Sequence, residues 1–153
     1  MKVTLKKMKR FLVFKLPSAY LCGVRLKTLE DDKAIVTVRH RWINQNPFRS
    51  MYFAVQSMAA ELTTGAIVIK KITDTGQPIS MLVTNHKGAF TKKAVGLITF
   101  TCNDGNLIDA AVQRTIETGE PQTIAMKSVG VNEEGEQVSA YEFEWGIKLK
   151  SKI

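Results

Sequence analysis

The stretch from residue 50 to residue 64, SMYFAVQSMAAELTT, constrains the fold more than any other part of the chain. It contains neither Gly nor Pro, and Gln56 and Glu61 are its only strongly polar residues. At about 100° per residue, one stripe along a helix is formed by Met51, Val55, Met58 and Leu62. A helix that is apolar on most sides has to be buried. We therefore predict a central helix over residues 50–71, ended by the lysines at 70 and 71.

The remaining segments mostly show the alternation of apolar and polar residues that is typical of half-buried strands. The alternation is clearest near the end of the chain, where every second residue from Tyr141 to Leu149 is apolar and points to one face. In residues 34–42 it places Val38 and Trp42 on one face. Strands are predicted over residues 22–29, 34–42, 79–85, 89–93, 95–102, 122–131 and 138–150, and a second helix, capped by Asn106, over residues 107–118.

One buried helix among largely antiparallel strands predicts an α+β fold in which a curved antiparallel β-sheet wraps around the helix. We expect residues 1–153 to form a single domain, because no linker or internal repeat divides them. An amphipathic basic helix is predicted within residues 1–20, over residues 2–16, and Pro17 is expected to break it. Such a sheet leaves edges that need protection, which favours a homo-oligomer.

The formal charge of +8 is concentrated at the N-terminus. Eight of the 22 Lys and Arg residues lie in the first 27 positions, which hold no acid, and the other 14 are balanced by 14 acids. This distribution argues against a nucleic-acid partner, since a nucleic-acid binder would spread cations over a binding face. Docking of residues 1–16 on anionic lipid or nucleic acid is a minor alternative, attraction of an anionic carrier is another, and a role in solubility is a third.

Several classes of protein and site are not expected. No apolar run approaches the roughly 18–20 residues of a membrane span, so we expect no integral membrane segment, and no convincing signal peptide is present. Cys22 and Cys102 lie in apolar settings without metal-ligand spacing, so reduced core thiols in a cytoplasmic protein are favoured over a disulfide. His40 and His86 are too isolated for a zinc site, and no metal is expected.

The string from Met51 to Gly65, M-Y-F-A-V-Q-S-M-A-A-E-L-T-T-G, resembles the central helix of hot-dog acyl-CoA thioesterases. It aligns without a gap with the family string M-H-A-G-A-L-F-T-L-A-E-A-A-S-G. Residues 90–96, F-T-K-K-A-V-G, are similar to a strand segment of the same superfamily. The resemblance spans roughly residues 3–150 and is strongest to a bacterial branch known mainly as a domain of unknown function. It implies the hot-dog fold.

The resemblance also implies catalytic groups. Glu61 matches the acid that activates water or attacks the thioester carbon, and the backbone N–H groups near Phe53 and Ala54 match the oxyanion hole. Tyr52 replaces the family His and is a candidate donor to the thioester oxygen. The competing interpretations are that Glu61 pairs with Arg39 or Arg41, or faces solvent, and that Tyr52 only packs in the core or an interface.

Further residues are candidates for substrate binding. Gln56 is a candidate to position water or substrate, and its alternative role is a contact at a subunit interface. Ser57 is a candidate to bond the attacking water, and its alternative is a bond to the helix backbone. Asn46, just before the helix, is a candidate site residue whose alternative is a role in the turn. The candidates to bind the phosphates of coenzyme A are Arg49, Lys87, Lys92 and Lys93. The alternative for each lysine is that it is simply a solvated surface residue.

These residues predict a hydrolase of acyl-CoA or acyl-carrier thioesters with its site at the interface of a homo-oligomer. The resemblance implies a coenzyme A thioester as substrate and no cofactor. The alternative is a hot-dog protein that binds an acyl chain or another apolar ligand without hydrolysing it, because the His-Gly motif of the family is replaced here.

Overall fold

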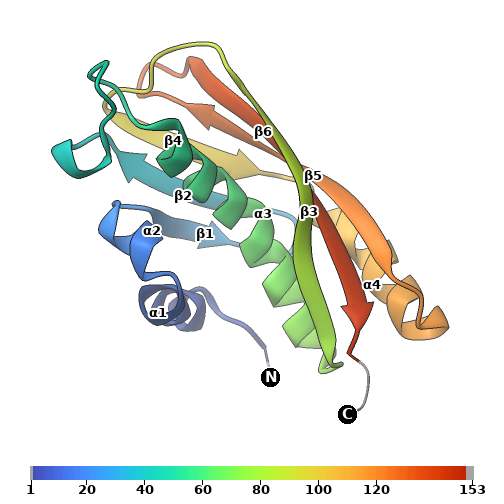
Figure 1. The fold of residues 1–153 in the computed structure, drawn as a ribbon. Helices are drawn as coiled ribbons and strands as arrows, with labels where there is room; N and C mark the ends of the chain where they lie inside the picture. Colours follow the sequence, from blue (N-terminus) through green and yellow to red (C-terminus); the bar gives the residue numbers. More distant parts are fainter. Residues whose placement is uncertain (1, 151–153) are drawn as a thin grey trace.

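The computed structural model describes residues 2–150. The helices are α1 (Leu5–Lys15), α2 (Pro17–Leu21), α3 (Phe53–Thr75) and α4 (Gly105–Thr118), with a short 3-10 helix, η1 (Trp42–Asn44). The strands are β1 (Arg25–Leu29), β2 (Ala34–Arg39), β3 (Ile79–Phe90), β4 (Leu97–Cys102), β5 (Gln122–Val131) and β6 (Gln137–Leu149) (Figure 1).

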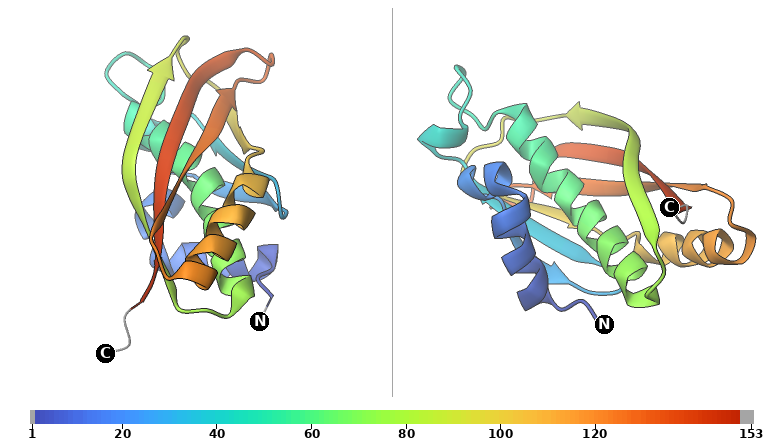
Figure 2. Two further views of the ribbon diagram at one scale, coloured as in Figure 1. Left: turned by 90° about the vertical axis from the view of Figure 1, so that its right-hand side faces the viewer. Right: turned by 60° about the horizontal axis from the view of Figure 1, so that its bottom comes forward.

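The six strands form one sheet in the order β1-β2-β4-β5-β6-β3, and every pair of neighbours is antiparallel. Figures 1 and 2 show the sheet curving around α3, with α1 and α2 at one end of the molecule and α4 at the other. The predicted architecture, a curved antiparallel sheet wrapped around a long central helix, is confirmed. Strands β1 and β3 are the two edges of the sheet.

The central helix α3 is buried along most of its length. Twelve of its 23 residues are buried, so its apolar surface is covered by the sheet on several sides. The helix begins at Phe53 rather than at residue 50, because the N–H of Met51 bonds to the carbonyl of Ala94 outside the helix. It continues past Lys70, which pairs with Asp74 one turn later, and ends at Gly76 in the left-handed conformation.

The alternation predicted for the last strand is confirmed in β6. Tyr141, Phe143, Trp145 and Ile147 are buried against the helix side, and the intervening residues are only partly buried. The other strands add Val36, Val38, Phe100 and Met126 to the same core. Burial of this many large side chains, each contributing about 1.5–3 kcal/mol, is the main source of stability.

The N-terminal region differs from its prediction. Helix α1 buries Met8 and Leu12, as its amphipathic pattern indicates, and it ends before Pro17 as predicted, but residues 17–21 form a second helix, α2, that was not predicted. Pro17 stands at the first position of α2, where its missing N–H needs no partner. The first strand accordingly begins at Arg25 rather than at residue 22.

Three further boundaries are corrected. Strand β2 ends at Arg39, so Trp42 lies in η1 with 83% of its surface exposed instead of sharing the face of Val38. Strand β3 runs through residues 87 and 88 without interruption, with its irregularity between Val83 and Asn85. Asn106 does not cap α4, which begins at residue 105.

Between residues 2 and 150, no helix is long and apolar enough to cross a membrane. In that range no group of three or more His, Cys, Asp and Glu side chains is placed to hold a metal ion. Cys22 and Cys102 are free thiols; burial is complete for Cys102 and raises its pKa to about 11.

Candidate active site at the start of the central helix

The loop that leads into α3 is held together by Asn46. Its side-chain oxygen accepts hydrogen bonds from the N–H of Phe48 (2.9 Å) and of Ser50 (3.2 Å), and its amide nitrogen donates to the Ser50 hydroxyl (3.0 Å). Arg49 adopts a positive φ of 59°, which closes the turn. Asn46 therefore positions the loop, and its amide is engaged within the loop.

The first turn of α3 leaves two backbone donors without acceptors. Tyr52 is the N-cap residue, and its side chain makes no capping hydrogen bond. Its carbonyl accepts from the N–H groups of Val55 and Gln56, whereas no acceptor among residues 2–150 pairs with the N–H of Phe53 or Ala54. These donors lie at the positive end of the helix dipole, and no acidic residue in the first turn offsets it.

A cavity of about 500 Å³ opens at this helix start. It contains six of the residues predicted from the sequence, which are Asn46, Tyr52, Phe53, Gln56, Lys92 and Lys93. The rest of its lining is Pro47, Phe48, Ser50, Met51, Phe90, Thr91 and Ala94. A cavity of this size, with apolar walls and a few polar groups, is typical of a ligand site.

Gln56 is the polar group best placed to orient a ligand in this cavity. Only 4% of its surface is exposed, and its Oε1 atom has no hydrogen-bond partner within the described chain. A buried amide oxygen without a partner is costly, so such atoms usually have a function or a bound partner. Gln56 therefore has free hydrogen-bonding capacity at the cavity wall.

Aromatic rings form the side of the cavity that faces β3 and β6. The ring of Phe53 lies edge-on to those of Tyr52 (5.0 Å between centroids) and Phe90 (6.2 Å), and Phe90 contacts Tyr141 in the same way (5.7 Å). About half of the surface of Tyr52, Phe53 and Phe90 is exposed. This exposed wall suits an apolar ligand or the surface of another subunit.

Ser57 does not project into the cavity. Its hydroxyl donates to the carbonyl of Phe53 (3.0 Å), one turn earlier in the helix, and lies 3.2 Å from the hydroxyl of Tyr141. The Tyr141 hydroxyl also reaches the Phe53 carbonyl (3.4 Å), and burial raises the pKa of Tyr141. Ser57 and Tyr141 thus hold the Phe53 carbonyl group by hydrogen bonds.

Glu61 is a carboxylate in a largely apolar setting. Burial raises its pKa from an ordinary 4.5 to about 7. No ion pair joins it to a cation of residues 2–150, and the predicted alternative partner Arg39 instead bonds to Glu133 (3.3 Å). At neutral pH about half of these carboxyl groups are ionised, which is the condition that a general base requires.

Glu61 and the free N–H groups lie too far apart along α3 to act on the same atom. Glu61 follows Phe53 by eight residues, which is a rise of about 12 Å at 1.5 Å per residue. Glu61 is accordingly absent from the lining of the cavity at the helix start. Within one copy of the chain, the predicted base and the predicted oxyanion hole are not brought together.

The predicted phosphate-binding cations divide into two groups. Lys92 is paired with Glu136 (2.5 Å) and Lys87 with Glu142 (3.1 Å), so both charges are already partly neutralised. Lys93 donates to the carbonyl of Phe48 (3.3 Å) at the cavity, and Arg49 has no ion-pair partner in the part of the chain that the structure describes. Lys93 is therefore the cation at the cavity without an ion pair, and Arg49 belongs to the adjoining loop but does not line the cavity.

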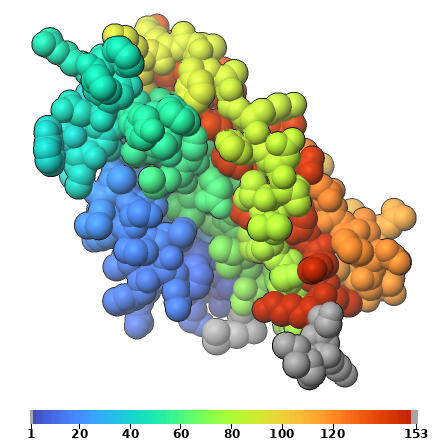
Figure 3. Space-filling model, in the orientation of Figure 1, coloured from blue at the N-terminus to red at the C-terminus, as the bar shows by residue number. Residues whose placement is uncertain are grey.

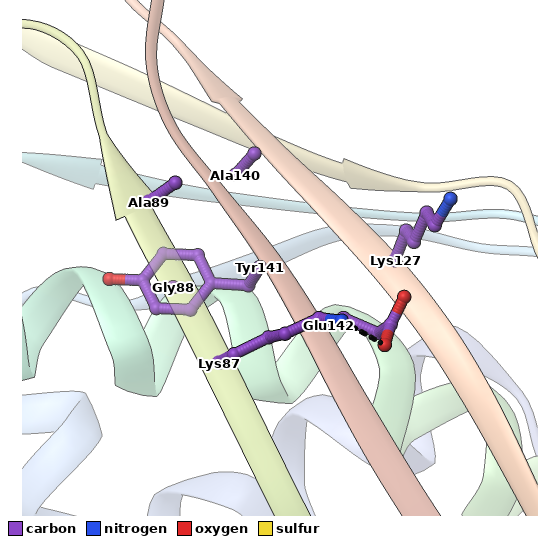
Figure 4. Close-up of a pocket in the computed structure, with 7 residues that line it drawn as sticks. All are labelled: Lys87, Gly88, Ala89, Lys127, Ala140, Tyr141 and Glu142. Atoms are coloured by element: carbon purple, nitrogen blue, oxygen red, sulfur yellow. Dashed lines mark ion pairs between the residues drawn. The ribbon is translucent and has the colours of Figure 1, made fainter.

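Lys87 belongs to a different hollow, of about 470 Å³ (Figure 4). Its charged neighbours there are Glu142 and Lys127. Since side chains alternate along a strand and Tyr141 points toward α3, Glu142 points to the opposite face of the sheet. The sequence prediction that grouped Lys87 with Lys92 and Lys93 is wrong for this reason.

The cavity also uses residues that the sequence did not single out. Phe48, Phe90 and Tyr141 form or support its walls, and Phe90 comes from β3, far from the helix in sequence. The inward alternation of β6 identified Tyr141 as a core residue. No local pattern in the sequence shows that it reaches Phe53.

Known structures share this fold over nearly the full length. A Pseudomonas aeruginosa protein of unknown function, named as a probable thioesterase, superposes with a TM-score of 0.83 at 20% identity, covering 98% of this chain and 99% of that one. A Chlorobaculum tepidum protein of unknown function gives 0.82 at 17% identity, covering 95% and 94%. A thioesterase from Haemophilus influenzae gives 0.75 at 11% identity, covering 97% and 93%.

A family model also matches the chain. No curated protein matches the chain. The solved structures establish the fold, since their identities are 20% or lower. The family model described as "Domain of unknown function (DUF4442)" matches residues 5–147, so the chain belongs to the DUF4442 family, and its fold is the hot-dog fold.

Proposed function

We propose that the protein hydrolyses acyl thioesters, with a carrier such as coenzyme A as the leaving thiol. The observation that carries the proposal is Glu61, a partly buried carboxylate with no ion-pair partner between residues 2 and 150 and a pKa that burial raises to about 7. A carboxylate with these properties is a competent general base at neutral pH. Its match to the acid of hot-dog thioesterases gives the same role from the sequence.

The reaction takes place in two steps. Water adds to the thioester carbon while Glu61 accepts a proton from the water, and the carbonyl oxygen becomes an oxyanion. The N–H groups of Phe53 and Ala54, which lack other acceptors, stabilise that oxyanion at the positive end of the helix dipole. The intermediate then expels the thiolate, which takes the proton back from Glu61, so that the products are a carboxylic acid and a thiol.

The roughly 12 Å between Phe53 and Glu61 along α3 requires that each site combine two copies of the chain. Strand β3 supports this arrangement, because it is a 12-residue edge strand whose outer side has no neighbour in the sheet. We propose that two copies pair through β3 about a two-fold axis. The antiparallel arrangement of their α3 helices then brings Glu61 of one copy toward the helix start of the other.

The acyl chain and the carrier occupy different parts of the cavity. The acyl chain lies against the rings of Phe53 and Phe90, whose exposed surfaces are apolar. The free Oε1 atom of Gln56 accepts a hydrogen bond from a donor near the carbonyl group. Lys93 at the cavity and Arg49 in the adjoining loop bind the phosphates of the carrier.

Hydrolysis of a panel of acyl-CoA and acyl-carrier thioesters, measured beside the Glu61→Gln variant, tests the proposal. We expect the variant to lose turnover by at least about a hundredfold, since general-base catalysis contributes about that much or more. Circular dichroism should show an unchanged fold. Equal turnover by the two proteins would refute a catalytic role for Glu61.

A second function, binding of an acyl ligand without hydrolysis, is favoured by one observation. The cavity is complete within a single copy of the chain, whereas the catalytic set is not. Native mass spectrometry of the purified protein separates the two functions. A retained acyl ligand together with no hydrolysis of any thioester supports the binding protein, and turnover of any thioester that depends on Glu61 supports the hydrolase.

A further inference from the structure

The positive charge of the chain is concentrated in its first 60 residues, beyond the first 27 described above. These 60 residues hold 12 of the 22 Lys and Arg residues but only three acids. The acids are Glu30, Asp31 and Asp32, which lie in the turn between β1 and β2. That turn is at the end of the β1–β2 hairpin that is farther from α2 and η1. Helices α1 and α2 contain no acidic residue.

The cations of this region are free to bind an external anion. The ion pairs among residues 2–150 involve Arg39, Lys70, Lys71, Lys87 and Lys92 as cations. None involves a cation of α1, α2 or β1, and none involves Arg41. Their charge is therefore not neutralised within the molecule.

Helix α1 has two faces of opposite character. Met8 and Leu12 are buried against the rest of the protein. Lys7, Arg10, Phe11 and Phe14 follow the spacing i, i+3, i+4, i+7 and share another face. Phe14 is 77% exposed and Phe11 is 44% exposed, so cations and aromatic rings lie together on the outside of the helix.

Exposed apolar side chains continue from α1 onto α2 and η1. Leu21 at the end of α2 is 66% exposed, and Trp42 in η1 is 83% exposed. The two segments are joined by Asn44, whose amide nitrogen donates to the carbonyl of Cys22 (2.9 Å) just after α2. Figure 3 shows the blue atoms of the N-terminal helices meeting the cyan atoms of the segment around residue 42 without a gap.

We propose that this surface docks on a bilayer that contains anionic phospholipid. The docking face consists of Lys7, Arg10, Phe11, Phe14, Leu21 and Trp42. Trp and Phe side chains enter the interfacial region of a bilayer, and the lysine and arginine side chains bind its anionic headgroups. No helix of residues 2–150 is long enough and apolar enough to span, so the association is peripheral and reversible.

More unpaired cations line a hollow on another side of α1, outside the docking face. It has a volume of about 250 Å³ and lies between α1 and β1, with Lys9, Arg25 and Lys27 among its lining residues. The Arg25 guanidinium stacks on the ring of Tyr20 at 3.9 Å, which fixes its position. Three cations and no acid line this hollow, so it adds to the positive charge of the N-terminal region.

Charge and composition favour a bilayer over two other partners. A second copy docked through the same surface about a two-fold axis would place like charges opposite one another. Nucleic acid would neutralise Lys7 and Arg10, but it offers no apolar region for Leu21 and Phe14. A bilayer with anionic headgroups satisfies both kinds of side chain.

Sedimentation of the full-length protein with large unilamellar vesicles tests the docking. We expect binding to vesicles that mix phosphatidylcholine with phosphatidylglycerol, weak binding to phosphatidylcholine alone, and loss of binding as salt rises. Arg10→Glu should weaken binding by about fivefold or more, since each cation near an anionic surface contributes about 1 kcal/mol. The matched control is Arg114→Glu, on exposed α4 at the other end of the molecule, which should bind as the unaltered protein does.

Tryptophan fluorescence provides an independent measurement, because the chain has two tryptophans in opposite settings. Trp42 is 83% exposed and Trp145 is 4% exposed. Docking should shift the emission of Trp42 to shorter wavelength, and Trp42→Phe should abolish the shift while most of the sedimentation remains. Phe14→Ala should weaken sedimentation, whereas Leu107→Ala, which removes a 53% exposed apolar side chain from α4, should not.

Several results would overturn the proposal. Equal binding to neutral and anionic vesicles, equal effects of Arg10→Glu and Arg114→Glu, or absence of the fluorescence shift would each exclude docking through this face. Salt-sensitive binding to duplex DNA or RNA without binding to vesicles would assign the cations to nucleic acid. A change in oligomeric state caused by Phe14→Ala, measured by light scattering, would make the face an interface between copies.

Discussion

The Oε1 atom of Glu61 lies close to the position that a Cβ atom at residue 65 would take, a position left open by Gly65. A Cβ atom built on Gly65 would be 3.1 Å from Oε1 of Glu61 and 3.1 Å from the Trp145 ring. Such distances are shorter than nearly all real Cβ contacts, so one of the two neighbours would have to move. Gly65 therefore leaves room for the Glu61 carboxylate and the Trp145 ring beside the middle of α3.

Gly65→Ala should reduce turnover without unfolding the protein. Alanine favours a helix by about 1 kcal/mol over glycine, which offsets part of the steric cost, so the melting temperature should change little. The displaced carboxylate should lower kcat by about tenfold, or about 1.4 kcal/mol in the barrier. The control is the double variant Gly65→Ala/Glu61→Gln, which should be no slower than Glu61→Gln alone if the glycine acts through Glu61.

The activity should rise with pH through about 7. A general base works in its ionised form, and burial raises the pKa of Glu61 to about 7. A plot of kcat/KM against pH should therefore increase below about pH 7 and level off above it. The residual activity of Glu61→Gln should lack this rise, and a rise that persists in the variant would assign the titration to another group.

The same carboxyl group should make folding depend on pH. Folding raises its pKa from 4.5 to about 7, so the folded state holds the proton more tightly than the unfolded chain does. Its stabilising contribution is complete below about pH 4.5 and is lost as pH rises to about 7. Urea denaturation should show Glu61→Gln to be more stable than the unaltered protein at about pH 8, by up to about 3 kcal/mol, and similar to it at about pH 4.

Two buried amide side chains should respond in opposite ways to apolar substitution. Gln56→Met replaces an oxygen that has no partner, so the free energy of unfolding should stay the same or rise by up to about 1 kcal/mol while acyl-CoA binding weakens. Asn44→Leu is the matched control, because the Asn44 amide bonds to Arg41, Cys22 and Arg39.

Asn44→Leu should cost about 3 kcal/mol or more, since it leaves several backbone groups without partners. Chemical denaturation gives the free energies, and isothermal titration with a non-hydrolysable acyl-CoA analogue gives the affinity. Loss of stability in both variants would show that Gln56 has a structural role rather than free capacity for a ligand.

The sequence predicts the elements that rest on periodicity. The apolar stripe of α3 and the alternation of β6 come from side chains that repeat at fixed spacing, so burial follows directly from the residue types. The prediction is incomplete where one residue has two roles. Pro17 ends the first helix, as predicted, but it also occupies the first position of α2, which has no apolar repeat long enough to reveal it.

The candidate site is predicted less completely than the fold. Glu61 and Gln56 are recognisable because they are the only strongly polar residues in an apolar helical segment. Phe90 and Tyr141 reach Phe53 only because β3 pairs with β6, in a register that places Phe90 opposite Ser139. The pairing of Lys92 with Glu136 likewise depends on contacts between distant segments, so its neutralisation is not evident from sequence.

The irregularity in β3 affects how the chain can associate. Thr84 has no partner residue in β6, and its hydroxyl instead bonds to the Glu144 carboxylate (2.7 Å), so the strand bends at this point. A straight strand from an unfolded chain cannot follow a bent edge over its whole length, whereas a two-fold-related β3 carries the same bend. The bend therefore favours closed pairing over open-ended fibre growth, and it protects the longest exposed edge of the sheet from aggregation.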